Sequence, residues 1–296
     1  MGLDSNGIRF ALYCKAHGVD FSRVAMIGRQ GLHLYPRDLK GNFREFGYLL
    51  DDNATTLMLT KNGGYAEEFF RYLGAEIIHS FDKSDYEGAS HVHDMNQILP
   101  DAFKEQYSVV IDGGSLEHVF NIPVAMRNCM NMVRAGGYYI GISPSNNCMG
   151  HGFYQFSPEL FFSLFCVENG YEVVNMVVCK DKPRAGWYSV KNPASIGRRV
   201  TLANCSPTYL FVLARRTKCV EPLKSMPQQS DYVSLWESAN GDVSVQKTKR
   251  RPWSARVAAR IPQSIRYVLK RLLSSFRPEF DPRCFQPMTK RDIGLM

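Results

Sequence analysis

The chain has 296 residues, of which 45% are apolar and 22% are charged. This composition is typical of a globular protein and excludes a disordered or collagen-like chain. The length allows one domain of about 200 residues with extensions, or two small domains. The net charge is +8, but residues 247–277 contain ten lysines or arginines and no acidic residue, so the rest carries −2. Charge therefore does not predict a nucleic-acid partner for the main part of the chain.

No apolar stretch approaches the roughly 20 residues of a membrane span, and the first residues do not read as a signal peptide. The eight cysteines form no CxxC pair. This spacing favours reduced thiols and gives no indication of a structural zinc site. We therefore expect a cytoplasmic protein.

The first elements read as a helix followed by a buried strand. Apolar residues at helical spacing over residues 5–18 predict a short helix that carries no chemistry. Residues 24–27 are apolar and lead into a turn that begins at Gly28 and ends at Gly31, as in the first strand of a doubly wound sheet. The polar stretch 32–64 predicts a loop with one helix near residues 43–50.

Three further strands are predicted at residues 76–81, 90–93 and 108–111, after a helix over residues 65–73. They are followed by Asp82, Asp94 and Asp112. Because the carboxyl ends of parallel strands meet at one edge of a sheet, these aspartates are expected to lie at a common ligand-binding edge.

The second half continues the alternation. The pattern predicts a helix over 123–133, a turn at Gly136 and Gly137, a strand over 138–143, and a helix that begins at the N-cap Ser157 and ends near Gly170. Strands at 171–180 and 208–215 have no helix between them, so they are expected to be antiparallel. The fold class predicted is α/β, with a doubly wound, mainly parallel seven-stranded sheet.

The last 79 residues differ from the rest. Residues 218–249 read as a polar linker, and residues 261–276 as a basic amphipathic helix. We expect three parts: an N-terminal helix (1–22), a Rossmann-like domain (23–217), and a linker with a basic tail (218–296). The basic helix is expected to contact a membrane surface or dock onto the domain, since it lacks the aromatic residues that bind nucleic-acid bases.

The strand-end aspartates, after a first strand that ends in a glycine turn, resemble the class I S-adenosylmethionine-dependent methyltransferases. The segments SLEHVFNIPVAMRNCMNMVRAGG, from Ser115, and MGHGFYQFSPELFF, from Met149, look like a methyltransferase-like family of bacterial proteins often associated with surface polysaccharide biosynthesis. The resemblance covers roughly residues 23–215.

The resemblance implies that S-adenosylmethionine is the cofactor. Gly28 and Gly31 would place backbone N–H groups against its methionine part. Asp82 would accept the two ribose hydroxyls, since two carboxylate oxygens suit a vicinal diol. Asp94 would take the adenine amino group, and Met95 would cover the ring.

Asp112 and Gly113 would line the pocket shared by cofactor and substrate. The chain departs from the family pattern at the first strand, where Met26 occupies the usual acidic position and Arg29 and Gln30 lie among the glycines. This departure supports an alternative hypothesis, a non-catalytic binding or scaffold protein.

His118 and His151 are the candidate general bases, because both follow strands at the ligand-binding edge and histidine titrates near neutral pH. Glu117 is expected to orient His118. The alternative for these histidines is structural, as a helix cap or a partner of loop carbonyls. His91 and His93 could form a metal site with Asp94, but no further cluster supports it, so no metal is predicted.

The leading prediction is therefore a methyltransferase that O-methylates a sugar, a glycolipid or another small acceptor in polysaccharide biosynthesis. The scaffold hypothesis and a nucleotide-sugar enzyme remain as alternatives. The protein is expected in the cytoplasm, with the basic tail contacting the inner membrane surface and no nucleic acid bound.

Overall fold

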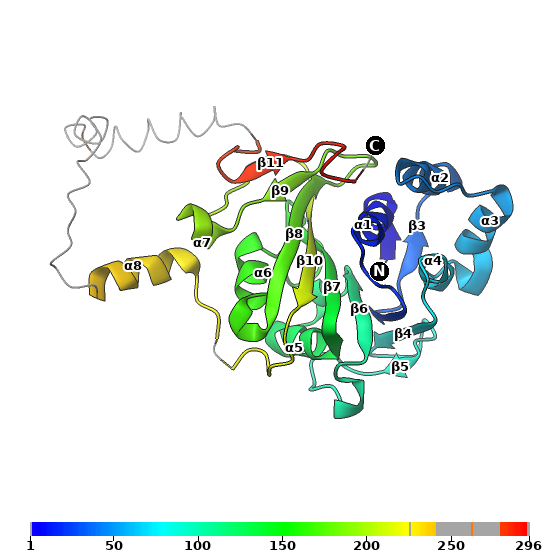
Figure 1. Cartoon of the computed structure of the whole chain (residues 1–296), viewed down its shortest axis with the longest axis horizontal. Coiled ribbons are helices and arrows are strands. Elements are labelled where there is room, and N and C mark those ends of the chain that lie inside the picture. The colour runs from blue at the N-terminus through cyan, green and yellow to red at the C-terminus, as the bar shows by residue number, and fades with distance from the viewer. Residues whose placement is uncertain (1, 225, 241–261, 263–278, 295–296) are drawn as a thin grey trace.

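The computed structural model describes residues 2–224, 226–240, 262 and 279–294. A nine-stranded sheet forms its centre, with the strand order β11-β9-β8-β10-β7-β6-β2-β4-β5 (Figure 1). The parallel core consists of β2 (Arg23–Ile27), β4 (Ile77–Asp82), β5 (His91–Val92), β6 (Tyr107–Gly113) and β7 (Val133–Asn146). The antiparallel pairs involve β8 (Tyr171–Lys180), β9 (Tyr188–Val190), β10 (Thr208–Arg216) and β11 (Phe285–Pro287). The predicted α/β class is confirmed, and each of the seven predicted strands is present. The expectation of a mainly parallel, seven-stranded sheet is wrong: in the described residues the sheet is mixed, with a parallel core, and β9 and β11 extend it to nine strands.

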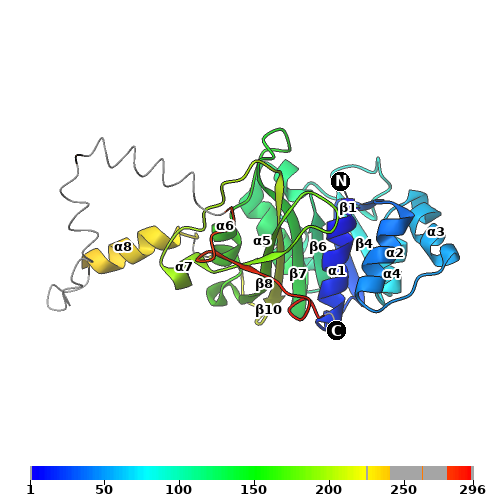
Figure 2. The ribbon, with the colours of Figure 1, turned by 90° about the horizontal axis from the view of Figure 1, so that it is seen from above.

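Helices cover both faces of this sheet (Figure 2). The helices α1 (Ser5–Ala16), α2 (Pro36–Glu45) and α4 (Glu67–Tyr72) pack on one face, and α5 (Ile122–Met132) and α6 (Pro158–Leu164) pack on the other. The central strand β6 is buried on both sides. Its Val109 and Ile111 face the first group of helices, whereas Val110 faces the second, as strand alternation requires. Tyr107 also packs with the second group, because the register of β6 and β7 shifts between Tyr107 and Val109.

The predicted loop over residues 32–64 is wrong. This stretch forms β3 (Gly31–His33), α2 and α3 (Asp52–Thr60), and the helix expected near residues 43–50 is absent because α2 already ends at Glu45. Helix α2 buries Leu39, Asn42 and Phe43. This narrow stripe has helical spacing, but the polar residues around it hid the period.

The N-terminal residues form an element that the sequence did not indicate. Strand β1 (Gly2–Asp4) pairs in parallel with β3, so Asp4 lies opposite His33. This small second sheet holds the start of α1 beside the end of β2. The N-terminal segment is thereby placed close to the ligand-binding edge of the main sheet.

The glycines expected to form a turn before the fifth strand form a bulge inside it. Tyr107 pairs with Val133, and the next pair joins Val109 to Tyr138, so β7 carries extra residues at this point. Gly136, with φ of 75°, lies in this bulge, where a left-handed backbone favours glycine.

The region after residue 217 contributes to the main fold. Strand β11 pairs with β9, and Cys284 and Phe285 are buried. The remaining elements are α7 (Pro193–Ile196), α8 (Ser230–Asn240) and the short 3₁₀ helices η1 (Lys61–Gly63), η2 (Asp101–Phe103), η3 (Leu116–His118) and η4 (Val167–Asn169). The basic helix predicted for residues 261–276 lies outside the described residues, apart from Pro262. No helix in the described part of the chain has the length and apolar character needed to cross a membrane.

Candidate active site

The order of the strands reverses next to β2, which has β4 on one side and β6 on the other. Ligands bind at such a switch point, outside the carboxyl ends of the strands. Two cavities lie here. The first, of about 370 Å³, is called the strand-end cavity and is lined by Gly28, Asp82, Lys83, His93, Asp94, Met95, Asn96, Ser115, His118, Phe120, Phe153 and neighbouring apolar residues. The second, of about 340 Å³, is called the carboxylate cavity and is lined by Gly2, Asp4, Asn6, Gly113, Gly114, Glu117, His118, Ile142, His151, Asp181, Tyr209 and Phe211.

Asp82 ends β4 and lines the strand-end cavity. Its carboxylate accepts one long hydrogen bond, 3.4 Å, from the backbone N–H of Ser84. Across from it, Gly28 has φ of 70° and donates its N–H to the carbonyl of Phe81 at 2.8 Å. The first strand therefore turns tightly with no side chain at the cavity wall, while the Asp82 oxygens retain capacity to accept hydrogen bonds from a ligand.

Asp94 holds the turn after β5. Its Oδ1 atom accepts hydrogen bonds from the backbone N–H of Asn96 at 2.9 Å and from the Asn96 amide at 2.7 Å. These hydrogen bonds, helped by the nearby Lys83, lower the pKa of Asp94. Met95, directly after it, is buried against the sheet. Asp94 is therefore ionised at neutral pH and oriented by its own turn.

An exposed aromatic pair stands at the same cavity. Phe120 is 71% exposed and Phe153 is 66% exposed, and their ring centroids lie 5.8 Å apart in an edge-to-face arrangement. Both line the strand-end cavity. Large apolar side chains exposed beside a cavity indicate a ligand surface, and the sequence analysis did not single out either residue.

The unusual residues of the first turn point away from the strand-end cavity. Arg29 binds Glu67 at 2.7 Å, and its guanidinium lies over the ring of Tyr65 at 4.1 Å. Gln30 is fully buried and donates to the carbonyl of Ile27 and to the hydroxyl of Ser115. Neither side chain lines the cavity, so the departure from the family's glycine pattern leaves the space beside Gly28 open.

Two residues expected at the cofactor line neither cavity. Gly31 begins β3 and is paired with Gly2. Asp112 is fully buried, and its Oδ1 atom accepts from the backbone N–H groups of Ser115 and Leu116 at 2.8 and 3.2 Å. Burial, together with the nearby Glu117, raises the pKa of Asp112 well above its usual range. Asp112 therefore shapes the turn after β6 and lines neither cavity.

Glu117, His118 and His151 come together where the loops after β6 and β7 meet. The Glu117 side chain is 0% exposed, and its Oε1 atom lies 3.3 Å from Nε2 of His151. The rings of His118 and His151 are 5.1 Å apart. Burial raises the pKa of Glu117 to about 7. Burial and the neighbouring His151 lower the pKa of His118. Glu117 contacts His151 here, and the expectation that Glu117 orients His118 stays a prediction.

Asp4, Asn6, Asp181 and Tyr209 complete the carboxylate cavity. The sequence analysis assigned no chemistry to the first helix, yet Asp4 is its N-cap and accepts from the N–H of Gly7 at 2.8 Å. Burial first, and then the charge of Asp181, raise the pKa of Asp4. The residues Asp-Ser-Asn before an apolar periodic run signalled a cap. Only the β1–β3 pairing brings that cap to the site.

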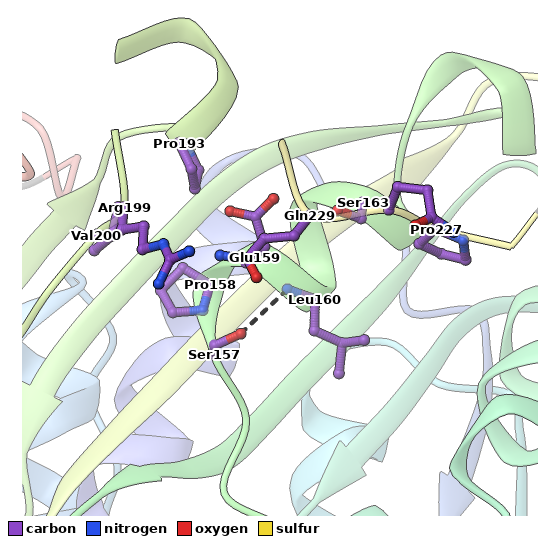
Figure 3. Close-up of a pocket in the computed structure, with 11 residues that line it drawn as sticks. Ser157, Pro158, Glu159, Leu160, Ser163, Pro193, Arg199, Val200, Pro227 and Gln229 are labelled. Atoms are coloured by element: carbon purple, nitrogen blue, oxygen red, sulfur yellow. Dashed lines mark hydrogen bonds between the residues drawn. The ribbon is translucent and has the colours of Figure 1, made fainter. Parts of the chain in front are cut away.

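A third cavity, of about 380 Å³, lies away from the strand ends, between α6, α7 and residues 227–229 (Figure 3). Its N-cap Ser157 accepts from the N–H of Leu160, as predicted. Glu159 accepts from the N–H of Ser230 at 2.8 Å, and Arg199 pairs with Asp231 at 2.6 Å. Glu159 and Arg199, the charged residues that line this cavity, both contact the start of α8, so neither is free to act on a ligand.

The structure therefore brings Gly28, Asp82, Asp94, Met95 and His118 to one cavity and Gly113, Glu117, His118 and His151 to the other. His118 lines both. The metal site considered at His91, His93 and Asp94 does not form: His91 packs between the rings of Phe81 and Phe103, whereas His93 approaches the carbonyl of Gln97.

No protein-family model matches the chain, and no curated protein sequence matches it. Solved structures with a similar fold include several methyltransferases and a branched-chain polyamine synthase from Thermus thermophilus. The trans-methyltransferase CalH, solved with SAH, is 12% identical with a TM-score of 0.37, and the match covers 72% of this chain and 57% of CalH. The N-methyltransferase NodS from Bradyrhizobium japonicum is 12% identical with a TM-score of 0.37, covering 71% of this chain and 97% of NodS. The 1,6-didemethyltoxoflavin-N1-methyltransferase from Burkholderia thailandensis, solved with S-adenosylhomocysteine, is 10% identical with a TM-score of 0.38, covering 71% and 79%. At these values the similarity concerns the fold alone.

Proposed function

We propose that this protein is an S-adenosylmethionine-dependent methyltransferase whose donor occupies the strand-end cavity and whose acceptor occupies the carboxylate cavity. The observation that carries this proposal is the position of His118, which lines both cavities at the switch point of the sheet. A group transferred between two ligands must pass through the point where their sites meet. His118 marks that point.

The strand-end cavity suits a nucleoside. Asp82 has carboxylate oxygens with only one long hydrogen bond, as a ribose diol requires. The edge-to-face pair of Phe120 and Phe153 offers an aromatic surface to a base, and Met95 closes the inner side. The open turn at Gly28 lets a ligand approach the backbone.

S-adenosylmethionine supplies an electrophilic methyl carbon on a sulfonium sulfur: a bond from the acceptor to this carbon forms as the carbon–sulfur bond breaks, and a hydroxyl acceptor gives up one proton. The Glu117, His118 and His151 cluster lies on the acceptor side, where it promotes the loss of that proton. Holding donor and acceptor in line supplies much of the remaining acceleration.

The lining of the carboxylate cavity defines the class of acceptor. Carboxylates come from Asp4, Glu117 and Asp181, and no lysine or arginine lies among the lining residues. Without a bound cation, an anionic acceptor would meet these carboxylates with no lysine or arginine to compensate them. Ile142 and Phe211 add an apolar wall. This lining supports a neutral, hydroxyl-rich acceptor such as a sugar or the head of a glycolipid, in line with a role in polysaccharide biosynthesis.

The decisive experiment is a calorimetric titration of the purified full-length chain with S-adenosylmethionine, with its demethylated product, and with a nucleotide sugar in parallel. We expect both adenosyl ligands to bind and the nucleotide sugar not to bind. A diphosphate is usually bound by several positively charged side chains. Lys83 is the one lysine or arginine that lines the strand-end cavity, so we expect a nucleotide sugar to bind poorly. Absence of adenosyl-ligand binding up to millimolar concentration overturns the proposal and favours the scaffold hypothesis. Binding of the nucleotide sugar alone favours the nucleotide-sugar enzyme.

A further inference from the structure

We propose that Glu117, His118 and His151 form a binding site for one divalent transition-metal ion, with Zn²⁺ the best-suited ion. Each residue offers one ligand atom, and the three atoms lie within 4.8 Å of one another. One carboxylate oxygen and two imidazole nitrogens form a ligand set that Zn²⁺ prefers, whereas Mg²⁺ and Ca²⁺ prefer oxygen ligands alone.

The closest pair already has the spacing of two ligands on one ion. Glu117 Oε1 and His151 Nε2 are 3.3 Å apart. With metal–ligand bonds of about 2.0 to 2.1 Å in a tetrahedral site, two ligand atoms are about 3.3 Å apart. The third ligand, His118, needs a small side-chain movement to reach the same distance.

A second, independent observation supports a cation here: the Glu117 carboxylate is buried and lacks hydrogen-bond partners. Its side chain is 0% exposed, and neither of its oxygens has a hydrogen-bond partner. The contact with His151 lacks hydrogen-bond geometry, so it does not satisfy Oε1. A buried carboxylate without hydrogen bonds is costly. A cation coordinated beside it supplies the missing partner.

The backbone fixes the two loops that carry the ligands. The carbonyl of Glu117 accepts the N–H of Phe153 at 2.7 Å and of Tyr154 at 3.3 Å. Gly152, with φ of 73°, allows this approach, since a Cβ atom there would lie 2.7 Å from the Glu117 carbonyl oxygen. Main-chain contacts therefore hold His151 next to Glu117. The two loops that carry the ligands are fixed to each other before an ion binds.

Three protein ligands leave the fourth position of a tetrahedral ion open, as in catalytic zinc sites. All three residues line the carboxylate cavity, so the open position faces the acceptor site. An ion there would bind an acceptor hydroxyl and lower its pKa, so that the proton leaves to solvent before the oxygen attacks. This role rests on the proposed function, whereas the binding of the ion does not.

The experiment is a titration of metal-free full-length protein with Zn²⁺, with Mg²⁺ as the second probe. We expect one Zn²⁺ per chain, at least 10²-fold weaker in H151Q and E117Q, and no comparable binding of Mg²⁺. H17Q is the matched control, because His17 is exposed and lines neither cavity. A variant with both C205S and C219S removes the exposed thiols as competing ligands and should keep the site.

His151 is half exposed, so H151Q is expected to fold, and its melting temperature without metal checks this. Equal Zn²⁺ affinity in the wild-type protein and H151Q overturns the proposal, as does loss of binding only in the thiol variant. S-adenosylhomocysteine binding is measured on the same samples. Zn²⁺ binding without nucleoside binding keeps the metal site and refutes the methyltransferase. Nucleoside binding without Zn²⁺ binding refutes the metal site and leaves the methyltransferase proposal standing.

Discussion

The two cavities at the edge of the sheet share His118 but are built in different ways. The strand-end cavity takes its polar residues from the ends of strands that follow one another in the chain, with Asp82 after β4 and Asp94 after β5. The carboxylate cavity collects residues from positions as distant as Asp4 and Tyr209. A site made by successive strand ends follows from topology. A site made by distant segments follows only from tertiary packing.

The carboxylates of the two cavities also differ in their environment. Asp94 is partly exposed, and its hydrogen bonds to Asn96 lower its pKa, so it is a permanent anion at neutral pH. Burial raises the pKa of Asp4 and brings that of Glu117 to about 7. The first environment suits fixed recognition of a ligand, and the second suits groups whose charge changes when a ligand or an ion arrives.

The strongest test of the difference between the two cavities is a variant that changes turnover and leaves donor binding unchanged. We expect H151Q to lower methyl-transfer kcat by about 10²–10⁴-fold, the usual contribution of a group that handles a proton, and to leave the affinity for S-adenosylhomocysteine unchanged. Single-turnover kinetics and calorimetry measure the two quantities. H17Q, at an exposed histidine far from both cavities, serves as the control. Equal kcat in H151Q and the wild-type protein would remove His151 from the mechanism.

D82A tests the strand-end cavity and should weaken donor binding. Two hydrogen bonds to a charged carboxylate, at about 1.5 kcal/mol each, correspond to an affinity loss of about 10²-fold. We expect this loss for S-adenosylhomocysteine and no change in Zn²⁺ affinity, because Asp82 lines only the strand-end cavity. The control is D85A, at a nearby exposed aspartate. An unchanged nucleoside affinity in D82A would show that the ribose is not held there.

A smaller effect is expected from F120A and F153A. Stacking of a base on an aromatic ring contributes about 1–3 kcal/mol, so each variant should weaken nucleoside binding by about 10-fold. Both side chains are exposed, so the melting temperature should stay within about one degree of the wild-type value. L49A, at another exposed apolar residue, is the control. If both phenylalanine variants bind the nucleoside normally, the base lies elsewhere.

The fold was largely predictable because its strands are continuous apolar runs ended by polar residues. Asp82 and Asp94 could be assigned to one edge from strand order alone. Helix α2 could not be predicted, because its buried stripe of Leu39, Asn42 and Phe43 contains a polar residue. Strand β11 could not, because a three-residue strand has no period and depends on pairing with β9.

The contact between Glu117 and His151 could not be predicted from the sequence either. Their proximity results from the Glu117 carbonyl accepting N–H groups from residues 153 and 154, a contact between two loops that no local pattern specifies. The same reason explains why Asp4 was missed. Its role as a helix cap is local and readable, whereas its place in the carboxylate cavity requires β1 to pair with β3.

The weakest expected effect concerns stability and the imidazoles beneath the strand-end cavity. His79 lies against His91 and Tyr107, and burial lowers the pKa of both histidines. A histidine whose pKa is lower in the folded state binds fewer protons there than when unfolded, so its stabilising contribution is complete above pH ~6.5 and is lost as the pH falls below that value.

We therefore expect the melting temperature to fall from pH 7 to pH 5.5, and to fall less steeply in H91F. The phenylalanine keeps the packing of His91 against Phe81 and Phe103. It removes both ring nitrogens, of which the buried Nε2 has no hydrogen-bond partner. The raised pKa of Glu117 acts in the opposite direction, since that contribution is present at low pH and is lost as the pH rises through about 7. Because His91 also lowers the pKa of His79, the difference in slope between H91F and the wild-type protein reports on this histidine pair and not on Glu117. Parallel slopes would mean that the pair does not titrate differently on folding.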